Sequence, residues 1–490
     1  MRWLLPACVL LPVSLAFCQD DAPGAPADLS QTELIRAAWR DVYRLPEGLR
    51  AEARYFDLTA VPPAERPAFA AVFSGHLNQL SREVEIRRPF VVKDANGQLL
   101  RVFRRWYGWP AQVWEELADP LYLYKLRVAT NYTPRVTLRP SLRPPRLGTT
   151  YREDLEPAPH LRATPELTAV LNGLTGATGT RLPVTRADWF LWQTAVSEGR
   201  GKAGYYDWLG IRDQKTFERL CRFSAELTAR LEHRRAVIKS GITQQNRRVE
   251  LVFTTGGEGW RTFDSAETVD RKDPVEVLDD AFQFDVTEQI FPLPNKLRGY
   301  LLANNKGTRQ DTAPANIIKG VRYRAKDSRL HVCLDCVACH NQAKGEAFVK
   351  DIDFAPLLHA ASVDYDQEAV LRAQYQRHPQ FKLGIERARQ DAATAVKDAT
   401  GLAPEAWGRE FHRWYVDYDE RPVDAAVVAR DFGVTRADLL RRFRAYDAGT
   451  KGYLRPTLSV IANGGSIGVV QYHSFIPAVY DVLQATQGKH

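Results

Sequence analysis

Apolar residues recur at helical spacing in several stretches of the chain and predict amphipathic helices there. The clearest are 32–45 (TELIRAAWRDVYRL), 186–196 (RADWFLWQTAV) and 367–401, where Gly401 is placed to end a long polar helix. The same spacing of apolar residues predicts helix for most of residues 164–240. Near the C-terminus, residues 425–443 predict two helices in a hairpin, with Thr435 as the N-cap of the second.

Other stretches alternate or are rich in β-branched and aromatic residues, which favours strands. Residues 90–103 predict a hairpin that turns at Asn96-Gly97, and residues 250–267 and 297–310 predict strands around glycine-rich turns. Together these patterns predict an α+β fold dominated by helices. We expect a mixed α/β region first, followed by a mainly helical region with short β hairpins.

A segment dense in proline and arginine, residues 134–163, interrupts these patterns and predicts a linker. It divides the mature chain into an N-terminal mixed α/β domain at 31–133 and a second domain at 164–402. A change of pattern after Gly401 sets apart a C-terminal helical unit at 403–490.

The first residues predict a secretory signal. Arg2 precedes an apolar run from Trp3 to Phe17, and a polar stretch rich in Asp, Ala and Pro follows. The run is too short to span a bilayer comfortably, so we expect export, with removal of residues 1–18 or of residues up to 27. Lipidation of Cys18 would anchor the chain to the envelope, but the bulky Phe17 before it disfavours this.

Composition fits a folded protein, with 44% hydrophobic and 26% charged residues, and the formal net charge is +8. For an exported chain, this basic balance favours an acidic redox partner, an anionic substrate or association with the cell envelope. It disfavours nucleic acid as a partner, because the expected compartment is periplasmic or otherwise outside the cytoplasm.

Residues 331–342 (HVCLDCVACHNQ) contain three cysteines and two histidines, the residue types that bind metals and haem. A zinc site needs four ligands, usually as two separated pairs, and no second pair exists. An iron–sulfur run from Cys333 would need a further cysteine at position 343, which is alanine, and the only other cysteine of the mature chain is the distant Cys221. The sequence therefore disfavours both a zinc site and an iron–sulfur cluster.

The segment Cys336 to His340 reads C-x-x-C-H, the attachment pattern of c-type haem. Two thiols three positions apart reach the two vinyl groups of one porphyrin, and His340 is then placed to bind the iron. We expect one covalently attached haem c held by Cys336, Cys339 and His340. Cys221 and Cys333 are left over, and in an oxidising compartment they either form a disulfide or remain as a free pair.

The second axial ligand of the iron is not methionine, because Met1 is the only methionine and leaves with the signal. A bis-histidine iron or an open, five-coordinate iron remains. His359 ranks first as the distal ligand because it follows the motif on an apolar stretch, and His378 ranks second. The other candidates are His76, His233, His331, His412 and His473.

Around this motif, the run 291–318 (FPLPNKLRGYLLANNKGTRQDTAPANII) followed by C-x-x-C-H resembles an uncharacterised family of large exported planctomycete-type proteins with a c-type cytochrome domain. Similar segments in the family correspond here to Asn78–Ser81, Tyr107-Gly108-Trp109, Trp189-Phe190, Ser240-Gly241 and Asn246-Arg247. The resemblance implies the cofactor and the compartment but no reaction. The extra Cys333 and the residues after the motif depart from the family pattern.

Three functions follow from these patterns. The first is one-electron transfer by a periplasmic mono-haem protein, with the large body docking a redox partner. The second is a haem enzyme of peroxidase or oxidase type that acts on a small oxidant at an open iron. The third is a haem-based sensor or envelope scaffold. A bare electron carrier needs only about 100 residues, so the size favours the second and third somewhat.

Overall fold

The structure is a computed structural model, and it describes the following residues: 29, 31–117, 165–198, 203–231, 235–240, 243–265, 272–274, 282–313, 329–341, 365, 368–369, 379–432, 434–449 and 456–486. The predicted signal at 1–18 and the whole predicted linker at 134–163 lie outside the described residues. The described part is mixed α+β and rich in helix, as the sequence predicts.

A four-stranded sheet with the order β2-β3-β1-β4 organises the N-terminal part of the chain. Its strands are β1 (Ala53–Asp57), β2 (Phe90–Val91), β3 (Leu99–Phe103) and β4 (Val184–Arg186). The helices of this part are α1 (Gln31–Arg44), α2 (Glu47–Arg50), α3 (Arg66–Gln79), α4 (Ala111–Glu115), α6 (Pro165–Thr178) and α7 (Ala187–Thr194), with 3-10 turns η1 (Pro63–Glu65), η2 (Lys93–Ala95) and η3 (Arg104–Tyr107). Buried aromatic rings fill the space between them; Phe190 packs against Phe56, Trp114 and Trp208.

The predicted hairpin at 90–103 is confirmed. Asn96 and Gly97 both adopt positive φ angles, 47° and 71°, which is the backbone that a tight hairpin turn of this kind needs. The turn lets β2 pair antiparallel with β3, with Val91 opposite Leu100.

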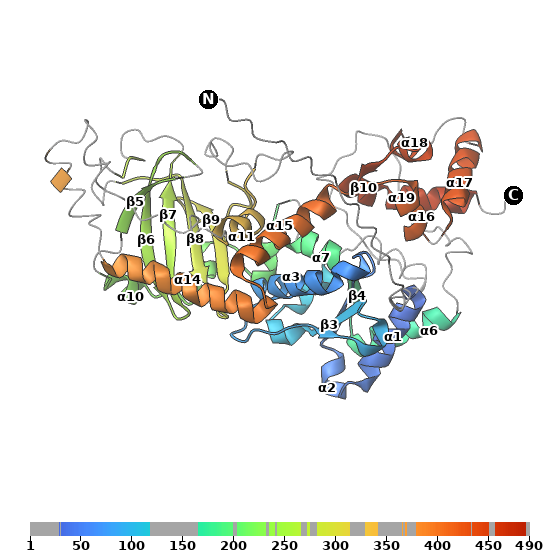
Figure 1. Cartoon of the computed structure of the whole chain (residues 1–490), viewed down its shortest axis with the longest axis horizontal. Coiled ribbons are helices and arrows are strands. Elements are labelled where there is room, and N and C mark those ends of the chain that lie inside the picture. Colours follow the sequence, from blue (N-terminus) through green and yellow to red (C-terminus); the bar gives the residue numbers. More distant parts are fainter. Residues whose placement is uncertain are drawn as a thin grey trace, which may run out of the picture.

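A second sheet of five antiparallel strands follows in the order β5-β6-β7-β8-β9. Its strands are β5 (Arg235–Lys239), β6 (Asn246–Thr254), β7 (Gly257–Asp264), β8 (Val286–Pro292) and β9 (Arg298–Asn304). The strands predicted around the glycine-rich turns are thus confirmed, and they join into one sheet. The five-stranded sheet and the helices within residues 425–485 lie towards opposite ends of the long axis of the molecule (Figure 1).

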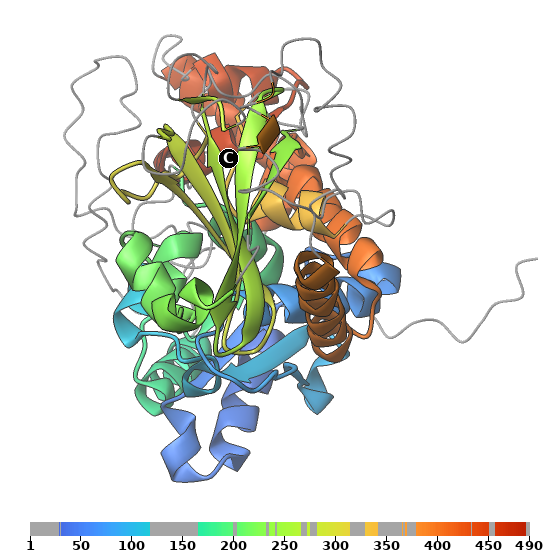
Figure 2. The same cartoon turned by 90° about the vertical axis from the view of Figure 1, so that its left-hand side faces the viewer.

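Helices cover this sheet. The long α14 (Pro379–Thr400) runs against β6 and β7, as the two views agree (Figures 1 and 2), and it ends at Gly401 with φ of 77°, as the sequence predicts. Three short helices, α8 (Tyr205–Leu209), α9 (Gln214–Leu220) and α10 (Ala225–Ala229), also pack against the sheet; α9 contacts β9 and α10 contacts β6.

The C-terminal part contains α15 (Pro404–Asp419), α16 (Ala425–Asp431), α17 (Arg436–Gly449), α18 (Pro456–Ala462) and α19 (Val469–Ala485), with a small pair of strands, β10 (Pro422–Val423) and β11 (Ile467–Gly468). The predicted helical hairpin is confirmed, because the Thr435 hydroxyl accepts the Asp438 N–H at 3.1 Å at the start of α17.

The boundaries expected at 134–163 and at 403 do not separate independent units. β4 and α6, which follow the predicted linker, join the N-terminal part: β4 pairs with β1, and α6 packs on α1. α15 packs on α3 and α7. An ion triad ties the same regions together, since the buried carboxylate of Asp188 accepts hydrogen bonds from Arg186 at 2.6 Å and from Arg421 at 3.3 Å.

The prediction of helix for residues 164–240 is wrong in two places. Residues 184–186 form β4, and residues 235–239 form β5, which the sequence pattern assigned to a helix. Both segments are short, so their periodicity does not distinguish strand from helix, and the partner strand in the sheet decides their conformation.

Candidate functional site

The cysteine motif lies on a short helix, α11 (Leu334–His340), which packs against α15. A sharp turn precedes it, in which Cys333 has φ of 73° and ψ of −65°, a conformation that non-glycine residues rarely adopt. The buried carboxylate of Asp335 stabilises this turn by accepting the main-chain N–H of His331 at 2.6 Å. The start of α11 is therefore fixed by the chain around it.

α11 brings the three predicted attachment residues together. Cys336 and Cys339 are three residues apart, about one turn of helix, and His340 is the last residue of α11. Cys336 is buried, Cys339 is half-buried, and the His340 side chain is 12% exposed. Burial raises the pKa of the Cys336 thiol, and the nearby Glu288 carboxylate raises it further, so this cysteine is a protonated thiol at neutral pH.

His340 faces the five-stranded sheet. Its Nε2 lies 3.6 Å from Oε1 of Glu288 on β8, and its ring lies near Trp260 on β7 and Tyr300 on β9, at centroid distances of 6.1 and 6.2 Å. The guanidinium of Arg298 donates to the main-chain carbonyl of His340 and lies over the Trp260 ring at 5.5 Å. The end of α11 is thus held by three neighbouring strands.

A buried charged cluster continues from Glu288 across the sheet. Arg247 on β6 lies 3.6 Å from the second Glu288 oxygen and makes a two-point ion pair with Asp264 on β7, with one hydrogen bond at 2.8 Å. Burial by itself would raise the pKa of Glu288, but the hydrogen bond with His340 and the charges of His340 and Arg247 hold that pKa below its usual value. Glu288 is therefore ionised.

A small cavity of about 20 Å³, which is room for about one water molecule, lies beside α11. Its polar lining comes from Arg247, Asp264, Glu288 and Thr243, and Cys336 lies in its wall. The other lining residues are mostly apolar: Val286, Tyr300, Leu301, Leu302, Ala313, Leu330 and Val332.

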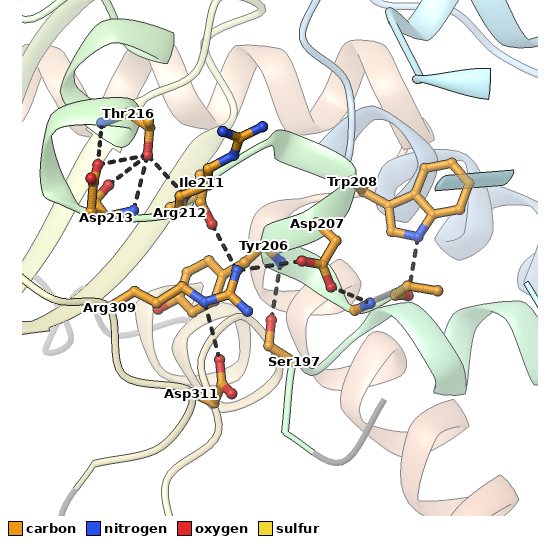
Figure 3. A network of polar contacts seen from close by, with 12 residues as sticks. Ser197, Tyr206, Asp207, Trp208, Ile211, Arg212, Asp213, Thr216, Arg309 and Asp311 are labelled. Carbon is orange, nitrogen blue, oxygen red and sulfur yellow. Dashed lines mark hydrogen bonds and ion pairs between the residues drawn. The ribbon is translucent and has the colours of Figure 1, made fainter. Parts of the chain in front are cut away.

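The edge strand behind the cavity is fixed by tyrosine hydroxyls. The outer N–H groups of β9 at Tyr300 and Leu302 donate to the hydroxyls of Tyr205 and Tyr206 on α8, each at 3.0 Å. Arg309 lies over the Tyr206 ring at 5.1 Å and donates to the Ile211 carbonyl at 2.8 Å (Figure 3). This network holds the strand that carries Tyr300 against the cavity.

The donor set fits the expected haem. Two thiols one helical turn apart and an adjacent imidazole are the chemistry that covalent haem attachment needs, and one of the thiols opens to the cavity. Across the described ranges, no three or more His, Cys, Asp or Glu side chains are grouped to hold a bare metal ion. His340 is the residue that the motif predicts as the iron ligand.

No histidine predicted as a distal ligand lines the cavity in the part of the chain that the structure describes. His76 contacts Thr194 at 2.6 Å, His473 contacts Tyr418 at 3.0 Å, and Nε2 of His412 lies 4.0 Å from Asp335. His331 lies beside Glu198, with Nδ1 3.5 Å from its carboxylate. The first-ranked His359 lies outside the described residues, and so do His378 and His233.

The expected disulfide between Cys221 and Cys333 does not form in the structure, where both are buried free thiols. Cys221 ends α9 beside Glu218, whereas Cys333 begins α11 beside Asp335 and acts electrostatically on Tyr205 and Tyr300. The two thiols belong to different local environments, and burial raises the pKa of each.

The sequence does not identify Glu288, Asp264, Arg298 and Trp260 as site residues, because none of them belongs to a recognisable motif. Only Arg247 gave a signal, as part of the Asn246-Arg247 segment. Two of the other family-like segments contribute to packing. Tyr107 stacks on Trp109, and the Asn78 side chain donates to the main-chain carbonyl of Arg87 at 2.7 Å.

Searches against models of protein families, curated proteins and solved structures return no match. The family resemblance drawn from the sequence therefore stays a prediction. Among the helices of the described ranges, none combines the length and the apolar character that a membrane crossing requires.

Proposed function

We propose that this protein is an exported mono-haem c-type protein that passes single electrons to and from a partner protein. The haem would be attached through Cys336 and Cys339, with His340 as the iron ligand. The observation that carries this proposal is the arrangement of the three side chains within the last five residues of α11, next to a cavity into which Cys336 opens.

The chain's own residues have distinct tasks in this proposal. Bound haem supplies an iron that gains and loses one electron at a time. The buried Asp335 and the packing of α11 on α15 orient the attachment residues, and Arg298 holds the carbonyl of His340. Cys339 is half-buried, so this end of α11 lies near the surface, where an acidic partner protein can approach a basic chain.

A second candidate is a haem enzyme acting on a small oxidant. One observation favours it: Glu288 and Arg247 bring a carboxylate and a cation to the cavity, the groups that move a proton and stabilise developing negative charge. A simple electron carrier has no need of such a pair inside its core.

Redox titration of the purified mature protein tests the proposal. The protein is produced in a bacterial host that attaches haem c, and its visible spectrum is followed during stepwise reduction and reoxidation. We expect one reversible one-electron transition and no peroxide-dependent oxidation of an added dye. Rapid turnover of the dye would favour the enzyme instead, and a colourless protein would contradict both functions.

A further inference from the structure

Cys333 has no part in the proposed haem attachment, and the disulfide predicted between it and Cys221 does not form. It stands three positions before Cys336, so the two cysteines make a second C-x-x-C pair that overlaps the C-x-x-C-H motif. Cysteines at this spacing are typical of reversible dithiol–disulfide pairs. Both are free thiols in the structure, and both are buried.

The main chain folds Cys333 back onto the first turn of α11. Its φ of 73° and ψ of −65° make a sharp bend directly before the helix. The Cys333 carbonyl accepts the N–H of Val337 at 2.7 Å, and the Cys333 N–H donates to the sulfur of Cys336. The N and Cβ atoms of Cys333 are bonded to the same Cα, so the Cys336 sulfur lies beside the Cys333 side chain. Both sulfurs also act electrostatically on the Tyr300 hydroxyl, which places them in one environment.

The other pair in the motif, Cys336 and Cys339, is less suited to a disulfide. Both residues lie inside α11, where side chains three positions apart have Cβ atoms about 5–6 Å apart. A disulfide needs its Cβ atoms about 3.5–4.5 Å apart. Cys333 precedes the helix and is not held at this spacing, so the backbone favours Cys333 as the partner of Cys336.

We propose that Cys333 and Cys336 form a reversible disulfide, which makes this pair a dithiol redox site. As the S–S bond forms, the two thiols lose two protons and two electrons, and a small-molecule disulfide such as oxidised glutathione takes these up and is cleaved to two thiols. One consequence rests on the proposed haem function. Cys336 cannot bond to Cys333 and to a haem vinyl group at once, so the disulfide withholds Cys336 from haem until it is reduced.

Mass spectrometry of the full mature chain tests the pair without any haem. The protein is produced in an oxidising compartment of a host that lacks haem c maturation, and it is denatured in the presence of N-ethylmaleimide. Trypsin cuts after Arg329 and Lys344 and releases all three cysteines of the motif in one peptide. We expect this peptide to be two hydrogens lighter than its reduced form and to carry one maleimide, on Cys339. Three maleimides, or a single maleimide on Cys333 or Cys336, would overturn the proposal.

Reversibility is tested with the same peptide after equilibration in glutathione and dithiothreitol buffers of increasing reducing power. We expect one two-electron transition in the wild type and its loss in C333A. The matched control is C221A, because Cys221 is also a buried free thiol but ends α9, and its transition should equal that of the wild type. A disulfide that no buffer reduces, or a transition that persists in C333A, would overturn the assignment.

Haem loading in a host with haem c maturation tests the consequence for Cys336. Without added reductant, C333A should carry more haem than the wild type and C221A, and dithiothreitol should raise the wild type to the level of C333A. Equal loading of all three proteins without reductant would overturn the withholding of Cys336. A mapped disulfide with no haem in any of them would contradict the proposed function and leave the dithiol site standing. If C333A does not fold, the wild-type peptide decides.

Discussion

Gly408 on α15 lies in close contact with the C-terminal end of α11. A Cβ atom at position 408 would lie 2.8 Å from the Cβ of Asn341 and 3.1 Å from the carbonyl oxygen of Val337. Carbon atoms in contact are normally about 3.5–4.0 Å apart. The G408A substitution therefore forces the two helices apart by roughly 0.7 Å or more, and the displaced segment is the one that holds Cys339 and His340.

Two opposing effects set the size of the change. Overpacking of a close contact costs about 1–3 kcal/mol. Replacing glycine by alanine inside a helix returns about 0.5–1 kcal/mol through its higher helix propensity. We therefore expect G408A to lower the free energy of unfolding by up to about 2 kcal/mol and to reduce the fraction of protein that carries haem.

Urea unfolding followed by tryptophan fluorescence measures the stability, and the ratio of haem to protein absorbance measures loading. Gly176 on α6 is the matched control, because it is also inside a helix but no atom lies within 4 Å of its ideal Cβ. G176A should gain about 0.5–1 kcal/mol and leave loading unchanged. If G408A gains stability as G176A does, the close packing of α11 on α15 is refuted.

Three further predictions concern the body of the fold. His76 is fully buried, and burial lowers its pKa from 6.5 to about 3. Between pH 6.5 and pH 3 the unfolded chain therefore binds a proton at His76 that the folded protein does not bind. The free energy of unfolding falls as the pH falls, by up to about 1.4 kcal/mol per pH unit. In H76Q, urea unfolding should show a shallower loss between pH 7 and 5, and parallel profiles would contradict the burial of a neutral histidine. D188N should lower the free energy of unfolding by about 3–5 kcal/mol, because it leaves the guanidinium groups of Arg186 and Arg421 without their shared buried carboxylate. A loss under about 1 kcal/mol would speak against that triad. R309A removes the cation over Tyr206 and should lower the free energy of unfolding by about 1–2 kcal/mol. Hydrogen exchange at the outer N–H groups of β9 should become faster. Unchanged exchange there would show that Arg309 does not hold the strand.

The sequence predicts this fold best where the signal is local. The turn at Asn96-Gly97, the helix end at Gly401 and the Thr435 cap each depend on a few adjacent residues, and all three are confirmed. β4 is different, because its conformation depends on pairing with β1 more than 120 residues earlier in the chain. A pairing at that distance leaves no periodic trace in the sequence, so the sequence alone does not predict it.

The candidate site also has one part that the sequence predicts and another part that it does not. Its motif, from Cys336 to His340, is contiguous and falls on one helix, as its spacing requires. Glu288 and Arg247 come from strands 41 residues apart in the chain, and they meet only because the register of the sheet places both on one face. Nothing in the alternation of β8 distinguishes Glu288 from an ordinary charged residue, so the sequence alone does not predict that it lies beside His340.

The intact mass of the denatured mature protein tests the covalent haem most directly, with the C336A/C339A double variant as the reference. Both proteins are produced in the same host with haem c maturation. We predict that the wild type is heavier than its polypeptide by one haem, and that the double variant has the mass of the polypeptide alone. A wild type with the bare polypeptide mass, under conditions in which a known c-type cytochrome is loaded in that host, would contradict the assignment of Cys336, Cys339 and His340 to haem.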